Sequence, residues 1–369
     1  METVYDLRTP AFLVDLETVK NNCKVMDEKC KRLGVQLRTN MKTHRTIEAG
    51  EYMTAGSKTC ISVSTLSEAE FYANAGYDDI TYAYPLSPDK IPQATQLLLR
   101  LEKFHVLIDN HVVLNSLAKN PPSLGRKWSV LLKVNCGYNR AGVNYDDPQS
   151  VELAREIASE SCVNFEGLYI HEGNAYGCNG EGNIKETTSE SLRRLVLFYN
   201  KLKEAGIVFP VVAIGSTPSC SKPPEDISGI TEFHPGNYVF YDYQQFLIGS
   251  CDMSDIAVRV LTRVIGNYPD RQQILIDCGW TGLSLDSLGK LKTGFCFFEG
   301  HPNLKLVKMT QEIGTVEEVE GSFDVTAYPI GSYLKIIPYH SCATAYMHPV
   351  YYVVNGDSVV DKWIPNRGW

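Results

Sequence analysis

The chain has 369 residues, of which 44% are hydrophobic and 21% are charged, and its formal net charge is -8. This composition is typical of a soluble globular protein with room for two domains. The negative charge argues against a surface that binds nucleic acid or an anionic membrane, and no apolar run approaches the ~18 residues that a membrane span needs.

The first ten residues, METVYDLRTP, contain acidic side chains and no apolar core, so they do not predict a secretory signal. The eleven cysteines are scattered along the chain and none are spaced as CxxC. We therefore expect reduced, mostly buried thiols in a cytoplasmic protein.

Short apolar segments alternate with amphipathic helical segments through the first two thirds of the chain. After a strand at 11–15 and a helix ended by Gly34, eight strand-like segments follow: VQLRTNMK, KTCISVST, DDITYAYP, HVLIDN, WSVLLKVN, NFEGLYIH, FPVVAIGS and TEFHPGNYVFYD. Eight such units over ~200 residues predict a (β/α)8 TIM barrel. A doubly wound open sheet is the alternative, but its GxGxxG turn is missing.

The pattern changes after about residue 245, where helical periodicity gives way to alternating strands with turns at Gly-Asn, Pro-Asp and Asn-Gly. The sequence therefore predicts an α/β barrel at 15–245 and an all-β domain at 246–369. Residues 1–14 are expected to add a strand to the second domain.

Polar residues gather where the predicted strands end, which is the rim that carries the active site in TIM barrels. Lys42 ends the first strand, Lys133 ends the fifth ahead of Arg140 in GYNRAG, and His171 ends the sixth. Lys42 has apolar neighbours, and a desolvated amine has a lowered pKa and acts as a nucleophile or base. Taken alone, the same stretch also fits an ordinary surface lysine.

Two turns of small residues follow the seventh and eighth strands. Gly215, Ser216 and Thr217 lie in IGSTPS, and Gly236 and Asn237 lie in HPGNY. In barrels these two loops often hold a phosphate through backbone N–H groups. Each turn alone also fits an ordinary tight turn, but their place on this pair of strands favours a phosphate site.

In the β domain, His340 and Cys342 are separated by one residue, and His348 lies six residues beyond Cys342. If the segment is a strand, His340 and Cys342 face the same side, so an imidazole nitrogen and a thiolate could bind one metal ion. Those ligands suit zinc, and two protein ligands leave coordination positions open. The alternative is a chance spacing with a cysteine that only packs.

Together these features resemble the fold-type III pyridoxal-phosphate enzymes, of which alanine racemase is the best-known member. The combination of MKTH, GYNRAG, YIHEGNAYG, GSTPS, HPGNYVFYD and YHSCAT resembles the eukaryotic D-serine dehydratases, with the D-threonine aldolases as relatives. The resemblance extends over essentially the whole chain.

The resemblance implies a role for each candidate residue. Lys42 would bind pyridoxal phosphate covalently and serve as the catalytic base. The other implied contacts are Gly215, Ser216, Thr217, Gly236 and Asn237 to the phosphate, Tyr169, His171 and Tyr176 lining the cofactor, Arg140 near its phenolic oxygen, and His340 and Cys342 to Zn²⁺.

Three positions depart from the racemases. His234 stands where they have an arginine at the pyridine nitrogen, Thr46 stands where they have a tyrosine at the phosphate, and no second acid/base tyrosine is identified in the β domain. The missing tyrosine, with the His340 and Cys342 pair present instead, argues against racemisation.

The implied reaction is the dehydration of D-serine to pyruvate and ammonia, with Lys42 removing the Cα proton and zinc assisting loss of the β-hydroxyl. The alternatives are a D-threonine aldolase, whose metal ligands are His and Asp, a 3-hydroxyaspartate dehydratase, a non-catalytic pyridoxal-phosphate carrier and a barrel of unrelated activity. The family also implies a small D-amino-acid substrate and a homodimer with the active site near the subunit interface.

Overall fold

The computed structural model describes residues 2–321 and 323–369 and divides into two compact units. One consists of Lys24–Gly236, Ile248–Ser250 and Asn366–Trp369. The other consists of Met1–Cys23, Asn237–Leu247 and Cys251–Pro365. The first boundary between them falls inside helix α1, Leu16–Leu33.

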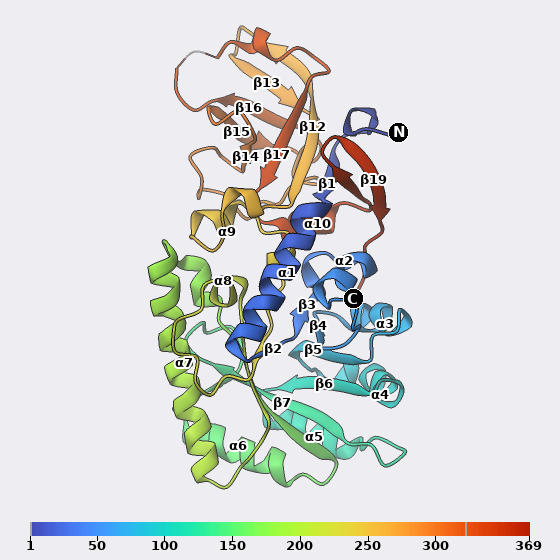
Figure 1. The fold of residues 1–369 in the computed structure, drawn as a ribbon, viewed down its shortest axis with the longest axis vertical. Coiled ribbons are helices and arrows are strands. Elements are labelled where there is room, and N and C mark those ends of the chain that lie inside the picture. The colour runs from blue at the N-terminus through green and yellow to red at the C-terminus, as the bar shows by residue number, and fades with distance from the viewer. Residues whose placement is uncertain (1, 322) are drawn as a thin grey trace. The chain divides into compact units, whose positions relative to one another are not determined.

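The unit that contains Lys42 is a parallel barrel, as the alternation of strands and helices predicted (Figure 1). Its strands follow the order β2-β11-β10-β9-β7-β6-β5-β4-β3, and β8 pairs with β7. Only Arg38 separates β2 from β3, so the two ends of this order are joined by continuous chain and the sheet closes on itself. The strands are β2 Gln36–Leu37, β3 Thr39–Asn40, β4 Ile61–Val63, β5 Asp79–Pro85, β6 Lys103–Ile108, β7 Trp128–Asn135, β8 Val143–Asn144, β9 Val163–His171, β10 Val211–Gly215 and β11 Glu232–Phe233.

The first and last predicted strands are shorter than the sequence pattern indicated. VQLRTNMK forms two pieces, and its last residues belong to a 3-10 helix, η2 Met41–Thr43. TEFHPGNYVFYD forms only the two-residue strand β11 before another 3-10 helix, η5 Asn237–Val239. Pro235 has no backbone N–H to donate to a sheet, and Gly236 follows it, so the apolar run after them cannot extend the strand.

Helices follow most barrel strands and begin at polar residues that cap them. Thr65 Oγ1 accepts a hydrogen bond from Glu68 N at 3.1 Å, and Asp147 Oδ1 accepts one from Gln149 N at 2.9 Å. No helix among the described residues is both long and apolar enough to cross a membrane. The helices of this unit are α2 Ile47–Met53, α3 Leu66–Asn74, α4 Ile91–Arg100, α5 His111–Lys119, α6 Pro148–Ser159, α7 Glu181–Glu204 and α8 Thr217–Ser221, with the 3-10 helices η2, η3 Pro88–Lys90 and η4 Gly173–Gly177.

The break between β2 and β3 is held by buried charges. Arg38 is 6% exposed and contacts Asp79 Oδ1 at 2.5 Å and Glu232 Oε2 at 2.8 Å. These partners lie on β5 and β11, so one guanidinium joins three parts of the barrel. A separate apolar layer of Leu107, Leu131, Tyr169 and Ala213 comes from β6, β7, β9 and β10.

The second unit is built on a mostly antiparallel sheet of order β15-β16-β13-β12-β1-β18-β19, with β17 paired to β12 and β14. The N-terminal strand β1 lies antiparallel to β12 and parallel to β18, so the chain's start does add a strand to this sheet. The strands are β1 Ala11–Asp15, β12 Val258–Tyr268, β13 Gln273–Ile276, β14 Cys296–Phe298, β15 Leu304–Met309, β16 Gly314–Glu318, β17 Tyr333–Pro338, β18 Tyr351–Asn355 and β19 Ser358–Trp363.

Helices are not absent from this unit, although the sequence pattern predicted an all-β domain. The chain forms α10, Ser341–Met347, directly after β17, and the α-helix α9, Tyr243–Leu247, lies earlier in the same unit. Its 3-10 helices are η1 Val4–Asp6, η5, η6 Met253–Asp255 and η7 Val325–Ala327.

Candidate active site

The carboxyl ends of the parallel strands bring several predicted residues of the barrel to one rim. His171 ends β9 and pairs in register with Gly215, which ends β10. Lys133 on β7 pairs in register with Tyr169 on β9. Because all of these strands run in the same direction, their last residues form one ring of side chains and turns.

Lys42 lies just beyond β3, in η2. Its backbone N–H donates to Asn40 Oδ1 at 3.0 Å, which caps this short helix. The side chain is exposed, which fits the surface lysine that the stretch alone also allowed. Its positive charge is one of the effects that lower the pKa of His171, which places the amine at the same rim.

The buried amine of the barrel belongs instead to Lys133, which is 4% exposed. Burial lowers the pKa of Lys133 to about 7, and the charge of Arg140 contributes to that lowering. Its Nζ lies 4.7 Å from the centroid of the Tyr169 ring, a cation–π distance. Sequence reasoning placed Lys133 at a strand end without assigning it a role.

Aromatic side chains surround His171. The ring centroid of Tyr138 lies 5.8 Å away at a steep angle, and that of Tyr176 lies 6.3 Å away. Arg140 is exposed and its guanidinium carbon lies 5.3 Å from the Tyr138 centroid. Burial holds the pKa of His171 well below its ordinary value, and nearby cations such as Lys133 lower it further, so the imidazole is neutral.

Tyr169 and His234 form a deeper layer. Their rings stack with centroids 3.8 Å apart, and the Tyr169 hydroxyl lies 2.9 Å from His234 Nδ1. Burial, with the charge of Lys133, keeps the pKa of His234 well below its ordinary value. Tyr169 therefore packs in the barrel interior, and a neutral histidine occupies the position before Pro235.

The turn after β10 presents a buried hydroxyl. Thr217 is 1% exposed, and its Oγ1 has no hydrogen-bond partner among the described residues. Gly215 leaves no room for a side chain, because a Cβ there would lie 2.1 Å from His234 Nδ1. At Gly236 a Cβ would lie 2.7 Å from the Asn40 carbonyl oxygen. Only glycine therefore fits at these two positions, because the His234 ring packs against the turn after β10 and the Asn40 backbone packs against Gly236.

His340 and Cys342 lie side by side, although not in a strand as predicted. His340 precedes α10 and Cys342 is the second residue of that helix. Burial lowers the pKa of His340, but the charge of Cys342 and the hydrogen bond to Asp286 raise it to about 10 overall. Pro338 ends β17, and the following polar residues turn the chain into a helix.

Two carboxylates that sequence reasoning missed organise this motif. Asp286 Oδ2 lies 2.5 Å from His340 Nδ1 and accepts its hydrogen bond, which leaves Nε2 as the other ring nitrogen. Asp242 is fully buried, and its Oδ2 accepts hydrogen bonds from Ser341 N at 2.9 Å and Asn237 Nδ2 at 2.8 Å. Asp242 lies inside HPGNYVFYD, so the motif marked it, whereas nothing in the sequence linked Asp286 to His340.

Asn237 belongs to the same cluster. Its Nδ2 also contacts Ser341 Oγ at 2.8 Å and Cys342 Sγ at 3.4 Å. His348 lies elsewhere: its Nε2 contacts the Gly282 carbonyl oxygen at 3.0 Å, and its ring packs on Phe12. Within the parts of the chain that the structure describes, no group of three or more His, Cys, Asp or Glu residues could hold a metal ion.

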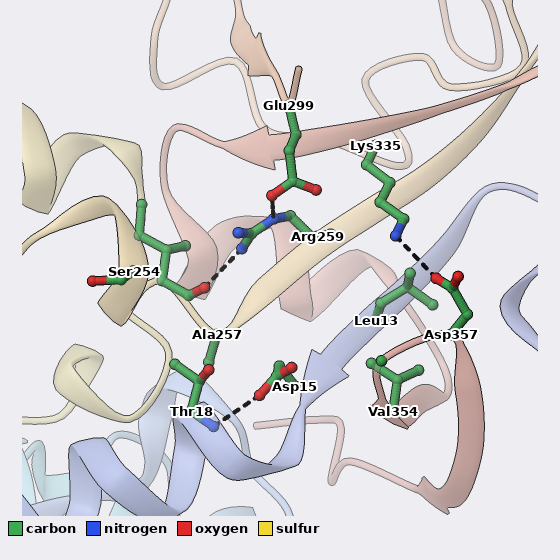
Figure 2. Close-up of a pocket in the computed structure, with 12 residues that line it drawn as sticks. Leu13, Asp15, Thr18, Ser254, Ala257, Arg259, Glu299, Lys335, Val354 and Asp357 are labelled. Atoms are coloured by element: carbon green, nitrogen blue, oxygen red, sulfur yellow. Dashed lines mark hydrogen bonds and ion pairs between the residues drawn. The ribbon is translucent and has the colours of Figure 1, made fainter. Parts of the chain in front are cut away.

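A pocket of about 250 Å³ in the β unit is lined by none of the predicted site residues (Figure 2). Its charges are already paired, Arg259 with Glu299 at 2.8 Å and Lys335 with Asp357 at 3.3 Å. Asp15 Oδ1 accepts from Thr18 N, which caps the start of α1. Because these charged side chains already have partners, we do not interpret the pocket as a catalytic centre.

Family models match both parts of the chain. Residues 14–244 match the model described as "Alanine racemase, N-terminal domain", and residues 257–354 match one described as "Putative serine dehydratase domain". A D-serine dehydratase of Dictyostelium discoideum is 38% identical, with 100% of this chain and 99% of that protein covered. A D-threo-3-hydroxyaspartate dehydratase of Delftia sp. strain HT23 is 30% identical, with both chains covered completely.

Solved structures agree with these matches. The Delftia dehydratase superposes with a TM-score of 0.93 at 30% identity over the whole of both chains. A D-threonine aldolase from Filomicrobium marinum, with a TM-score of 0.86 at 23% identity, covers 99% of this chain and 97% of its own, and shares the fold.

Proposed function

Because the chain belongs to the alanine racemase-like family that includes the D-serine dehydratases, we propose that it is a D-serine ammonia-lyase that converts D-serine to pyruvate and ammonia. The proposed reaction uses pyridoxal phosphate and Zn²⁺. The observation that carries the proposal is the 38% identity to a D-serine dehydratase over the full length of the chain.

The residues at the barrel rim suit pyridoxal phosphate. Lys42 has an exposed amine to bind the aldehyde carbon. The buried Thr217 hydroxyl, which has no hydrogen-bond partner among the described residues, fits a phosphate. We assign Ser216 and Asn237 to the same phosphate, and Arg140, Tyr169, His171 and Tyr176 to the surroundings of the ring.

The pair formed by His340 and Cys342 suits a zinc ion. An imidazole nitrogen and a thiolate are zinc ligands, and the hydrogen bond from His340 Nδ1 to Asp286 would leave Nε2 as the nitrogen that binds the metal. A metal-free form of a D-threo-3-hydroxyaspartate dehydratase variant has been solved, and the cysteine replaced in it lies two residues after the histidine replaced in another variant. That is the spacing of His340 and Cys342.

When bound, pyridoxal phosphate would stabilise negative charge at the substrate Cα, and zinc would supply a Lewis acid for the departing hydroxide. In the proposal, Lys42 Nζ takes the Cα proton. The imidazole of His171 is neutral, so it adds no further positive charge to the rim beside Lys42. Asp286 holds the Nδ1 proton of His340, which keeps Nε2 directed to the metal.

Two substrate assignments compete with D-serine. The relatives include a D-threonine aldolase from Arthrobacter, 27% identical, as well as the 3-hydroxyaspartate dehydratase. An aldolase would release glycine and an aldehyde, and a 3-hydroxyaspartate dehydratase would release oxaloacetate. A non-catalytic carrier is disfavoured because the chain has the β unit with its histidine–cysteine pair.

The test measures pyruvate from D-serine, oxaloacetate from D-threo-3-hydroxyaspartate and glycine from D-threonine on purified protein before and after chelation. We expect pyruvate to dominate, to fall on chelation and to return with zinc. Pyruvate production that survives thorough chelation would exclude the metal role, and glycine as the main product would make the enzyme an aldolase.

Two variants separate the two cofactors. Lys42→Ala should lose both the visible absorbance of bound cofactor and all turnover. Cys342→Ala should keep the absorbance and lose at least ~100-fold in kcat, about 3 kcal/mol of transition-state stabilisation. Cys162→Ala, at another partly buried cysteine, is the matched control and should keep both. An active Cys342→Ala would make the metal assignment wrong.

The homodimer and the cytoplasmic location belong to the same proposal. Sedimentation equilibrium at micromolar concentration should give twice the 41.2 kDa chain mass. A monomer with full activity would remove the need for an active site near a subunit interface.

A further inference from the structure

A buried carboxylate, Glu172, lies one residue beyond His171 and reaches the turn after β10. It is 2% exposed, and its backbone N–H donates to the Gly215 carbonyl oxygen at 2.8 Å. Its Oε2 accepts from Ser219 Oγ at 2.5 Å, and its Oε1 accepts from Ser191 Oγ at 3.4 Å. The carboxylate is therefore tied to α8, the helix that begins at Thr217.

A chain of hydroxyls continues from Glu172 to the predicted phosphate cradle. Ser219 Oγ lies 2.7 Å from Ser216 Oγ, and Ser219 N donates to Ser216 Oγ at 3.3 Å. Ser216 and Ser219 are both buried, at 3% and 1% exposure. Because this burial shields the hydroxyls from bulk solvent, the direction of each hydrogen bond is set by its neighbours.

Each hydroxyl has one proton to donate, so the hydrogen bonds that link Glu172, Ser219 and Ser216 can run in only two directions. When Glu172 is ionised, its carboxylate can only accept hydrogen bonds. The Ser219 hydroxyl then donates its hydrogen bond to Glu172, and the Ser216 hydroxyl donates its hydrogen bond to Ser219. Ser216 then has no proton for a phosphate. When Glu172 is protonated it donates to Ser219, Ser219 donates to Ser216, and the Ser216 proton becomes free.

We propose that Glu172 is a positioning residue that couples phosphate binding to proton uptake: the protonated carboxyl, acting through Ser219, turns the Ser216 hydroxyl into a donor to the cofactor phosphate. The proposal rests on the proposed function. A nearby phosphate dianion would also disfavour a second negative charge, so its charge favours the same protonated form.

The surroundings of Glu172 favour this switch. Burial raises its pKa, while the hydrogen bonds from Ser219, Ser191 and the backbone of Ala175 lower it in part. Two titratable groups that interact with it are the thiols of Cys136, after β7, and Cys220, on α8. Burial raises the pKa of both thiols, so both are neutral and neither fixes the charge of Glu172.

The test is the pH dependence of cofactor affinity between pH 6 and 9, with the apo-protein titrated by pyridoxal phosphate and, separately, by pyridoxal. For wild type, the dissociation constant for pyridoxal phosphate should rise with pH more steeply than for Glu172→Gln, by up to about tenfold per pH unit. The amide in Glu172→Gln is neutral at every pH and keeps a donor toward Ser219. With pyridoxal the two curves should coincide, because that ligand has no phosphate.

Two further variants test the chain of hydroxyls itself. Ser219→Ala cuts the link, so its slope should fall toward that of Glu172→Gln. Ser191→Ala removes a contact to the other carboxylate oxygen and should keep the wild-type slope. Calorimetry in two buffers of different ionisation enthalpy should show more proton uptake for wild type than for Glu172→Gln.

Parallel pyridoxal-phosphate curves for wild type and Glu172→Gln would overturn the proposal, as would an equal difference with pyridoxal. If Glu172→Gln does not fold, the comparison of wild type with Ser219→Ala decides it in the same way. A wild-type protein that binds neither ligand would instead overturn the proposed function, and this inference with it.

Discussion

At the scale of single residues, the buried Thr217 hydroxyl has no partner within the described part of the chain, and a ligand that accepts its hydrogen bond would remove that energetic cost. Thr217→Val keeps the shape and deletes the buried hydroxyl, so the free protein should be equally or more stable. Affinity for pyridoxal phosphate should fall about 10- to 150-fold, since a hydrogen bond to a charged group contributes roughly 1.5–3 kcal/mol. Thermal unfolding without ligand and a cofactor titration measure the two effects.

Thr188→Val is the matched control, because Thr188 Oγ1 on α7 is likewise buried without a partner among the described residues. It should leave cofactor affinity unchanged. If both valine variants weaken affinity alike, Thr217 does not contact the phosphate.

Lys42 and Lys133 show how far the burial of a lysine can be predicted from its neighbours in the sequence. The sequence drew attention to Lys42 because a lysine at a strand end with apolar neighbours suggests desolvation. The desolvated amine is Lys133. Burial depends on which strands flank a residue, and β7 lies between β6 and β9, whereas Lys42 extends from a short helix beyond β3. Local apolar neighbours do not contain that information.

At the scale of elements, Arg38 determines how the barrel closes between β2 and β3. Arg38→Met would leave Asp79 and Glu232 as buried, unpaired carboxylates, which should cost about 3–5 kcal/mol of unfolding free energy at pH 7. Arg155→Met, at an exposed helical pair with Glu152, is the control and should cost less than about 1 kcal/mol. Urea unfolding measures both.

The cost of Arg38→Met in unfolding free energy should depend on pH, because Asp79 is titratable. Burial alone would raise the pKa of Asp79, but the hydrogen bond from His105 and the charge of Arg38 hold it below its ordinary value. Such a group stabilises the fold above its unfolded pKa of about 3.9, and that stabilisation is lost as pH falls toward the folded pKa. The destabilisation by Arg38→Met should therefore shrink below pH 4. An equal cost at pH 7 and pH 3 would mean that lost packing, not charge, explains it.

The elements that the sequence located well are those with long apolar runs. β5, β6, β7 and β9 were found because strands buried on both faces are almost continuously hydrophobic. The segment from His340 to Cys342 was misplaced in a strand, because its helix is one of seven residues and rests on Asp242, almost 100 positions away. His340 and Cys342 nevertheless lie close together, because His340 is the N-cap of α10 and Cys342 is in the first turn of that helix.

At the scale of the whole molecule, none of the eleven cysteines forms a disulfide in the described residues, and eight of them are buried, as the absence of CxxC spacings predicted. Burial raises the pKa of the Cys23 and Cys30 thiols to about 12, so almost none of their thiolate is present at pH 8. A thiol reagent at pH 8 should therefore modify at most the three partly buried cysteines, Cys60, Cys162 and Cys342, in the native protein.

Denaturation without reductant should release all eleven thiols, and fewer would indicate a disulfide. Zinc added to the native protein should lower the number of modified thiols by one, because a metal-bound thiolate at Cys342 is protected from the reagent. The same addition to Cys342→Ala should change nothing, while Cys162→Ala should behave as wild type with one fewer reactive thiol. If zinc protects no thiol in the wild-type protein, His340 and Cys342 do not form a metal site, and the hydroxide must leave with help from another group.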